Sequence, residues 1–251
     1  MYMEEFKIDP TIQYDVVELP SRGIHYQNNK KSVRVAYLTA ADENILSAPN
    51  LIQSNNLIPE IIKRKVIDKD INTEELVDED VRAILIFLRN TAFGSEYEVT
   101  LNDPKTDEPF VAKCDLSSLD FKPFDLVPDS MGEYSFLMPK TGVDITFKFL
   151  TQKQEKEIDE IKKSWNGLGF PPVKTKELEF MIKSVKGNRD MMNIRNFIET
   201  LPIKDAQEFR KYVNKHKPGL DLKKVATAPS GEEVEYYIGF GVEFFRPFFG
   251  V

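Results

Sequence analysis

The segment from Asp78 to Phe93 places the strongest constraint on how this chain can fold. Three acidic residues open it, apolar residues recur through it at helical spacing, and Gly94 follows it. Acids complement the dipole at the start of a helix, and glycine favours the position just after the last turn. Ile86 and Phe87 widen the apolar stripe beyond one face. We therefore expect a helix that the rest of the chain buries on most sides.

Alternating and turn-forming segments surround this helix. Extended patterns precede it over 14–19 and 32–38, with short helices over 39–46 and 57–67, and Pro49 is expected to stop the first of these helices. Two pairs of strand-like segments follow it, each around a polar turn, and predict hairpins over 97–101 with 110–113 and over 134–138 with 143–150. Later patterns predict helices over 151–165, 175–186, 190–200 and 205–215 and strands over 222–228, 234–238 and 242–245.

These patterns predict an α+β fold. Two helical segments are each followed by short antiparallel β-hairpins, and the chain begins with an extended N-terminal arm. Residues 1–150 are expected to form an N-terminal α+β half that carries the arm and two hairpins. Residues 151–251 are expected to form a helical C-terminal half that ends in short strands and a Phe-rich tail. The 251 residues suffice for one large domain or two modest ones.

Aromatic side chains gather at the end of the sequence. Four phenylalanines flank an arginine and a proline there, in the order Phe244, Phe245, Arg246, Pro247, Phe248 and Phe249. A chain end frays unless something holds it, and so much exposed apolar surface usually marks an interaction site. The tail therefore packs into its own core or docks on a neighbour, where aromatic residues around an arginine are typical of interface hot spots. Both interpretations favour binding and packing over catalysis.

Composition excludes several classes of partner. The net charge of −7 leaves no broad basic field for a nucleic-acid backbone. The longest apolar run, 83–88, is too short to span a bilayer, and the first residues lack the pattern of a signal peptide. A single cysteine, Cys114, rules out an intrachain disulfide and suits a reducing compartment. We expect synthesis in a cytoplasm, with neither nucleic acid nor membrane as a partner.

Motifs of enzymes and cofactor sites are missing. The sequence contains neither a Gly-x-Gly-x-x-Gly nor a Walker-type loop, and its two histidines, His25 and His216, lack the spacing of a metal motif. Nothing in the sequence marks a base beside Cys114. We therefore expect no enzyme, no cofactor, no metal and no small-molecule substrate. A glycosidase-type carboxylate pair stays open, because its diagnostic is a distance in three dimensions.

Two segments carry a resemblance to a known family. Leu19 to Tyr26 is Leu-Pro-Ser-Arg-Gly-Ile-His-Tyr, and Leu38 to Leu46 is Leu-Thr-Ala-Ala-Asp-Glu-Asn-Ile-Leu. Together they resemble the baseplate proteins of T-even-type contractile-tailed phages, a family that includes hub and hub-assembly components. The likeness extends through 78–94, the region of Gly187 and Pro202, residues 217–221 and the Phe-rich end.

The resemblance departs from the family at two turns. Several relatives carry Cys-x-x-Cys knuckles in their hairpins, whereas the corresponding turns here, 102–107 and 227–231, contain no cysteine. The resemblance therefore implies hairpins that rely on Pro, Gly and Asp turn chemistry, without zinc.

The resemblance implies a non-enzymatic structural component of a phage tail baseplate, near the central hub. It would be made in the host cytoplasm and bind other baseplate or hub proteins in the virion. Its expected partner-binding residues are those of the tail (Phe244, Phe245, Arg246, Phe248 and Phe249) and of the early turn (Pro20, Arg22 and Tyr26). In the alternative interpretation of that turn, Pro20 and Gly23 only shape the backbone. The rival functions are a transient hub-assembly factor absent from the mature virion, an envelope-degrading hydrolase and a nucleic-acid-binding adaptor.

Overall fold

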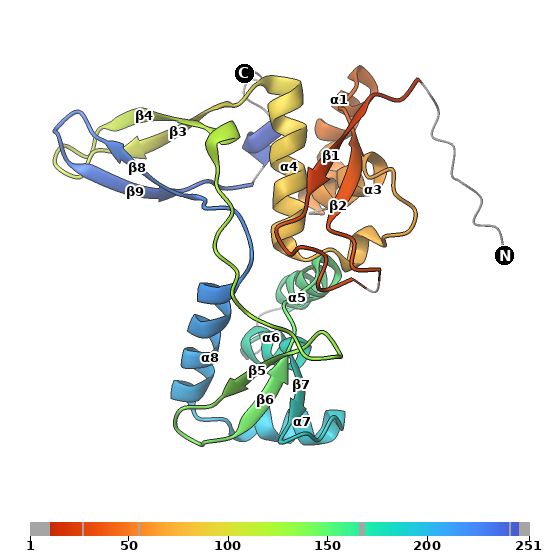
Figure 1. Cartoon of the computed structure of the whole chain (residues 1–251). Helices are drawn as coiled ribbons and strands as arrows, with labels where there is room; N and C mark the ends of the chain where they lie inside the picture. The colour runs from red at the N-terminus through yellow and green to blue at the C-terminus, as the bar shows by residue number, and fades with distance from the viewer. Residues whose placement is uncertain (1–10, 27, 55, 166–168, 241, 246–251) are drawn as a thin grey trace.

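Two lobes, each with its own cluster of buried hydrophobic residues, make up the part of the chain that the computed structural model describes (Figure 1). That part comprises residues 11–26, 28–54, 56–165, 169–240 and 242–245. The core of the upper lobe is drawn from residues 17–116 and 220–245, and the core of the lower lobe mainly from residues 124–213. Helices combine with small antiparallel sheets of two or three strands, which confirms the α+β class.

The upper lobe is built around the helix that the sequence predicted. Helix α4 (Asp78–Phe93) has its apolar face fully buried, with Ile84, Leu85 and Leu88 at most 1% exposed. One side of α4 is covered by a hairpin of β1 (Tyr14–Glu18) and β2 (Ser32–Ala36) and by small helices (Figure 1). Those helices are α1 (Ala40–Leu46), α2 (Pro49–Gln53), α3 (Leu57–Lys65) and the 3-10 turn η1 (Thr73–Glu75).

On its other side the upper lobe extends into an arm of two hairpins, which lie side by side although they are far apart in sequence (Figure 1). The first pairs β3 (Glu96–Asn102) with β4 (Pro109–Asp115) and leads into the 3-10 turn η2 (Leu116–Ser118), and the second pairs β8 (Lys223–Thr227) with β9 (Glu233–Tyr237). The tips of the hairpins are fastened by Asp103. Its carboxylate accepts hydrogen bonds from the amide and hydroxyl of Ser230, at 2.9 and 2.7 Å.

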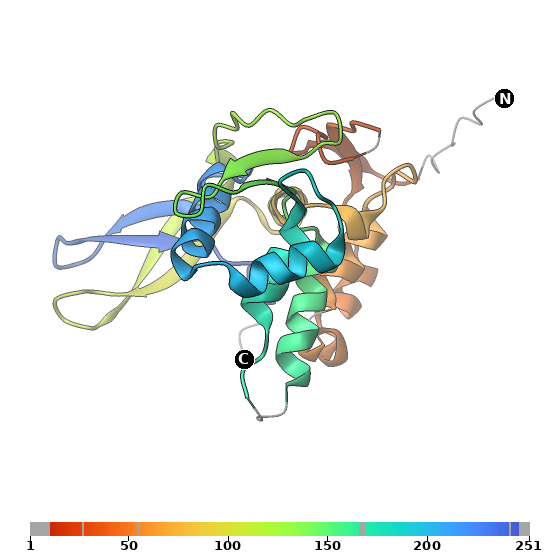
Figure 2. The ribbon, with the colours of Figure 1, turned by 90° about the horizontal axis from the view of Figure 1, so that it is seen from below.

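The lower lobe packs helices around a three-stranded sheet with the order β5-β6-β7. Figure 2 shows it from below, with α7 and α8 in front and the arm projecting to one side. Its aromatic core includes Tyr134, Phe147 and Phe209, each at most 1% exposed. The strands are β5 (Tyr134–Leu137), β6 (Asp144–Phe147) and β7 (Ile182–Val185), and the helices are α5 (Gln152–Ser164), α6 (Val173–Met181), α7 (Met191–Thr200) and α8 (Ile203–His216).

The structure corrects three local predictions. The helix expected over 175–186 ends at Met181, because the following residues pair with β6 as strand β7. The strand expected over 242–245 is a 3-10 turn, η3 (Val242–Phe245). A strand would send neighbouring side chains to opposite faces, whereas both Phe244 and Phe245 are buried in one core. Pro49 starts α2 rather than stopping α1, at the first helical position, where its missing N–H costs nothing.

The two lobes do not follow the division expected at residue 150. Strand β6 lies before that point and pairs with β7 after it. Residues 220–245 return to the upper lobe, where Phe244 and Phe245 join the core that residues 17–116 begin. Each lobe is therefore assembled from segments on both sides of residue 150.

Backbone pairing joins the lobes at two places. Val77 forms an isolated antiparallel bridge with Thr151, and the N–H of Gln152 donates to the carbonyl of Leu76 at 2.8 Å. Nearby, Phe121 bridges Leu220. The chain crosses between the lobes near residues 121 and 220, where the two crossing segments pair with each other, and Val77 and Thr151 add a second contact.

Replacing Asp103 with alanine should destabilise the arm. The substitution leaves the Ser230 amide and hydroxyl without their acceptor, along with the amide of Lys105, which donates to Asp103 at 2.9 Å. Each hydrogen bond of this kind contributes about 0.5–1.5 kcal/mol to stability. Urea unfolding measures the loss, and Glu108→Ala, at an exposed position in the same turn, is the control. Equal stability of the two variants would show that the tips are not fastened by this carboxylate.

Candidate interaction site

The turn between β1 and β2 closes on a buried carboxylate, that of Asp80 in the first turn of α4. Asp80 is 0% exposed. The amide of Ser21 donates to its Oδ1 at 2.9 Å, and the hydroxyl of Ser21 donates to its Oδ2 at 2.5 Å. The hydroxyl of Tyr26 also donates to Oδ2, at 2.5 Å, and accepts the N–H of Val77 at 3.1 Å. Ser21 and Tyr26 of the early turn thus fasten that turn to the start of the central helix.

Burial governs the electrostatics of this carboxylate. It raises the pKa of Asp80 from its ordinary 3.8 to about 6, and the hydrogen bonds from Ser21 and Tyr26 act in the opposite direction. Burial, together with the neighbouring Asp80, also raises the pKa of the Tyr26 hydroxyl. The tyrosine therefore stays protonated and remains a donor to the carboxylate.

The backbone of the turn explains its glycine. Arg22 and Gly23 have φ angles of 55° and 74°, in the region that glycine adopts without strain. A Cβ atom on Gly23 would lie 2.5 Å from the carbonyl carbon and oxygen of Lys30, which is too close for any side chain. Gly23 thus meets a steric requirement of the turn, and Arg22 points its side chain to the surface.

Two further acids at the start of α4 bind the segment that precedes β8. The Nζ atom of Lys217 lies 3.0 Å from Oε1 of Glu79 and 3.6 Å from Oδ2 of Asp78. Gly219 packs directly on Glu79, whose Oε2 would lie 2.5 Å from a Cβ at that position. The early turn and residues 217–219 therefore meet at the same end of α4. We call this cluster the α4 joint; it consists of Ser21, Tyr26, Asp78, Glu79, Asp80, Lys217 and Gly219.

The same turn also contacts the lower lobe. The ring of His25 meets those of Tyr134 and Phe149 edge-on, with centroids 5.8 and 5.5 Å apart. Burial, with a smaller contribution from Lys148, lowers the pKa of His25 from 6.5 to about 4. His25 is therefore neutral at pH 7. One short turn thus binds the upper lobe through Asp80 and packs on the lower lobe through His25.

The described part of the aromatic tail lies in the chain's own core. Phe244 and Phe245 are 0% and 2% exposed, and the ring of Phe244 packs against those of Tyr97, Phe240 and Phe245. The guanidinium of Arg89, itself buried, lies over the rings of Tyr97 and Phe244 at 5.2 and 5.8 Å. Of the two predicted arrangements of the tail, Phe244 and Phe245 therefore follow the one in which it packs into the chain's own core. Arg246, Phe248 and Phe249 lie outside the described residues.

The remaining predicted contact residues divide between interior and surface. Pro20 and Tyr26 are buried, whereas Arg22 is exposed. From the sequence, Asp80 is expected only to complement the helix dipole, and its pairing with this turn is not predicted. A signal was present, because Asp80 precedes Ile84 and Leu88 by four and eight residues and so lies in their apolar stripe.

No group of three or more potential metal-ligating side chains occurs within the described ranges. A groove of about 410 Å³ runs between α4, α5 and residues 238–240, and its lining includes the apolar residues Val81 and Ile238. Both acidic and basic side chains line the groove, and Asp78 among them is paired with Arg82 at 2.6 Å.

Among the helices described, none is both long and apolar enough to cross a bilayer.

Comparison with known proteins identifies the family. Over residues 12–246 the sequence matches the family described as T4 bacteriophage base plate protein. The chain belongs to this family. The match covers both lobes and the whole α4 joint, so the predicted resemblance is confirmed, and the protein is a phage baseplate protein with its place in the virion tail. No curated protein and no solved structure gives a significant match.

Replacing Tyr26 with phenylalanine should lower stability by about 1–3 kcal/mol, because the buried N–H of Val77 then loses its acceptor and Oδ2 of Asp80 loses one of its two donors. Urea unfolding measures the change. Tyr237→Phe is the matched control, since that side chain is 70% exposed and its hydroxyl is expected to contribute less than about 0.5 kcal/mol. Similar stability of Tyr26→Phe and Tyr237→Phe would contradict the proposed role of the joint.

The joint should also give a distinct pH dependence. Between about pH 4 and pH 6 the folded protein keeps the Asp80 proton that the unfolded chain has lost, so this group's contribution to stability falls by about 3 kcal/mol as pH rises. His25 acts in the opposite sense, because between about pH 4 and pH 6.5 the unfolded chain binds a proton that the folded protein excludes.

Single substitutions measure the contributions of Asp80 and His25 separately. The free energy of unfolding of the wild type minus that of Asp80→Asn should fall by about 3 kcal/mol from pH 4 to pH 6.5, and the same difference for His25→Gln should rise by a similar amount. Urea titrations at half-unit pH intervals measure both. Parallel stability curves for the wild type and either variant would show that the corresponding group titrates alike in the folded and unfolded states.

Proposed function

We propose that this baseplate protein is a non-enzymatic structural component near the central hub, made in the host cytoplasm, that acts through interfaces with other baseplate or hub proteins. The observation that carries the proposal is the α4 joint. The first family motif supplies Ser21 and Tyr26 to this joint, and Lys217 binds Glu79 there from the segment that leads out of the lower lobe.

A rigid joint suits a structural role, because it fixes the directions in which the two lobes present their surfaces. The carboxylates of Asp80 and Glu79 are almost completely buried and engaged with residues far away in sequence. The arm meanwhile exposes apolar side chains, with Val111, Val225 and Tyr237 56–70% exposed. Exposed apolar surface of this kind is typical of contact sites.

The tail fits the proposal as an anchored connector. Phe244 and Phe245 fix the chain in the upper-lobe core, so the segment from Arg246 onward starts from a defined point. We assign the outward contacts to Arg246, Phe248 and Phe249, together with the exposed Arg22. Pro20, Tyr26, Phe244 and Phe245 support these contacts from inside, by holding the turn and the tail in place.

The rival functions differ in what they require. A transient assembly factor has the same fold and interfaces but leaves before the virion is complete. An envelope hydrolase needs two carboxylates free to act in one cleft, and Asp78, the α4 acid in the 410 Å³ groove, is instead paired with Arg82 and Lys217. These ion pairs engage Asp78 in the joint, and the other acids that line the groove are Glu155, Asp159 and Glu160 of α5.

Quantitative mass spectrometry of purified mature phage tests the proposal. We expect the chain at a fixed ratio to known tail proteins, and that ratio reports the symmetry it obeys. Absence from the particle combined with abundance in infected cells would replace the structural role with that of an assembly factor.

Deleting residues 246–251 should separate folding from assembly. The deletion spares Phe244 and Phe245, so the purified chain should keep its melting temperature, while its amount in the particle should fall at least about tenfold. Phe244→Ala is the contrasting variant, since loss of a fully buried phenylalanine costs about 3–5 kcal/mol and reduces stability itself. Normal incorporation of the shortened chain would contradict the role of the tail.

A further inference from the structure

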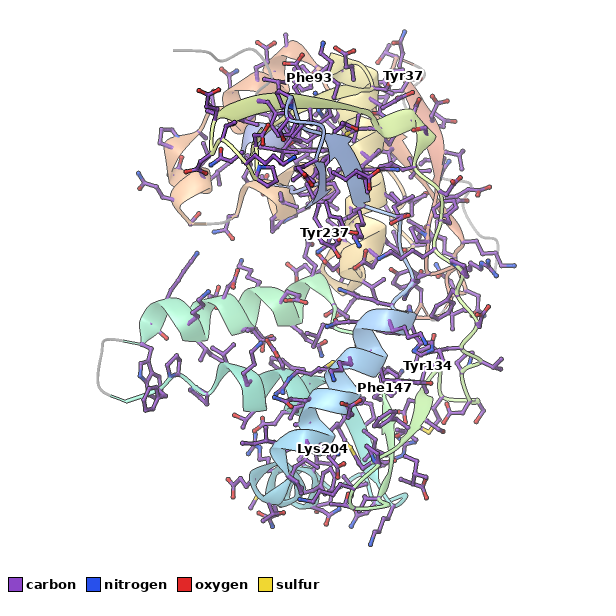
Figure 3. The ribbon with its side chains drawn as sticks, turned by 90° about the vertical axis from the view of Figure 1, so that its left-hand side faces the viewer. Tyr37, Phe93, Tyr134, Phe147, Lys204 and Tyr237 are labelled. Carbon is purple, nitrogen blue, oxygen red and sulfur yellow. The ribbon has the colours of Figure 1, made fainter. Side chains whose placement is uncertain are left out.

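Within the described residues, strand β5 is an edge strand of the lower-lobe sheet, since it pairs with β6 alone in the order β5-β6-β7. Helix α8 lies alongside it (Figures 1 and 2), and the ring of Phe136 lies 4.8 Å from that of Tyr212. Figure 3 shows Tyr134 and Phe147 of the same sheet next to α8. An open strand edge therefore runs beside a helix.

The register shows which backbone groups of β5 are open. The N–H of Met138 donates to the carbonyl of Val143 at 2.9 Å, and in an antiparallel pair every second residue bonds in this way. Residues 134 and 136 therefore bond to β6, and Ser135 and Leu137 direct their N–H and C=O groups to the free edge. Asp144 confirms this alternation of hydrogen bonds along the strand. It lies opposite Leu137, but its carbonyl accepts a hydrogen bond from the N–H of Lys186, on the β7 side.

A hollow of about 340 Å³ follows this edge. Phe136 and Leu137 both line it. Because neighbouring residues of a strand point to opposite faces of the sheet, the hollow extends around the edge of β5 from one face to the other. Its other wall is one stripe of α8, in which residues three to four positions apart face the strand: Glu208, Lys211, Tyr212, Lys215 and His216. The space is bounded by an open backbone on one side and a helix on the other.

The edge lacks the usual protection against pairing. Natural edge strands carry charges or prolines that discourage another strand from adding. The sequence of β5, Tyr-Ser-Phe-Leu, contains neither, and the proline that lines the hollow, Pro139, lies two residues beyond the end of the strand. The exposed strands of the arm differ, since β3 carries Glu96 and Glu98, which pair with Lys113 of β4.

The charges around the hollow select the occupant. Its one lining acid, Glu208, is paired with Lys211 at 2.9 Å. Lys215 is exposed on the same stripe and adds a positive charge, beside an apolar wall that includes Leu137, 57% exposed. A segment that carries acidic side chains among apolar ones complements this lining.

We propose that an extended acidic and apolar segment of another protein adds to β5 as a further strand and lies against α8. Main-chain hydrogen bonds to Ser135 and Leu137 supply affinity, and the hollow and Lys215 supply selectivity, as in other cases of strand addition. This inference rests on the proposed structural role, because it identifies one of the interfaces through which the protein would act. The test uses the purified chain, so it can fail while the virion experiment succeeds, or the reverse.

The probe is a fluorescein-labelled octapeptide, Ser-Glu-Val-Glu-Phe-Glu-Val-Ser. Two further peptides are its controls: one has Lys in place of Glu, and the other has N-methyl groups on alternate amides and so cannot pair along one edge. Fluorescence anisotropy with the full chain measures affinity, and hydrogen exchange locates the bound peptide. We expect the acidic peptide to bind and to protect residues 134–138, with affinity at least about tenfold above that of either control peptide.

Two matched variants lie on the same helix. Lys215→Glu reverses a charge that lines the hollow and should weaken binding of the acidic peptide at least about tenfold. Lys204→Glu makes the same change at an exposed position outside the lining (Figure 3) and should leave binding within about twofold. Leu137→Pro removes an open N–H without removing a bond to β6, so it should abolish binding at an unchanged melting temperature.

Several results would overturn the proposal. They are no binding of any peptide up to millimolar concentration, protection away from 134–138, equal binding of the lysine or N-methyl peptide, and equal weakening by Lys204→Glu. Self-association of the free chain that Lys215→Glu abolishes would identify a second copy as the occupant, in place of an acidic partner.

Discussion

The buried carboxylate of Asp80 is the interaction on which the rest of the structure depends. A charge-bearing group in a core is costly unless donors surround it, and here the donors come from Ser21 and Tyr26, more than fifty residues earlier. The carboxylate thus converts a local turn into a long-range constraint on the start of α4. The adjacent Glu79 does the same for Lys217 and Gly219 from the other end of the chain.

This arrangement gives the family motif a physical meaning. Gly23 is required because the backbone of Lys30 leaves no space for a Cβ atom, and Tyr26 because its hydroxyl both donates to Asp80 and accepts from Val77. His25 carries the same turn onto the aromatic core of the lower lobe. The motif therefore maintains the relative placement of two lobes, and a protein built into a large assembly needs that placement to be fixed.

Sequence periodicity predicted the elements well and their partners poorly. The stripe in α4 and the alternation around polar turns identify the helix and the hairpins, because both signals are local. Strand β7 was missed because Ile182 to Val185 are apolar enough to continue a helix, and only pairing with β6 decides otherwise. The joint could not be predicted, because no local pattern links Ser21 to Asp80 or Lys217 to Glu79. Arg22, which the structure places on the surface, is proposed as a contact residue from the resemblance alone.

The tips of the arm are fastened by modest interactions. The resemblance implies a metal-bound knuckle at the hairpin turns of several relatives, and a structural zinc contributes about 10–16 kcal/mol to folding. The clasp of Asp103 and Ser230 fastens the same turns with hydrogen bonds that contribute about 1 kcal/mol each. The hairpins must therefore rely on apolar contact along their length, through buried residues such as Ala112 and Tyr236. The arm is then stabilised mainly by apolar contacts along its hairpins, and its tips are the part that opens most easily.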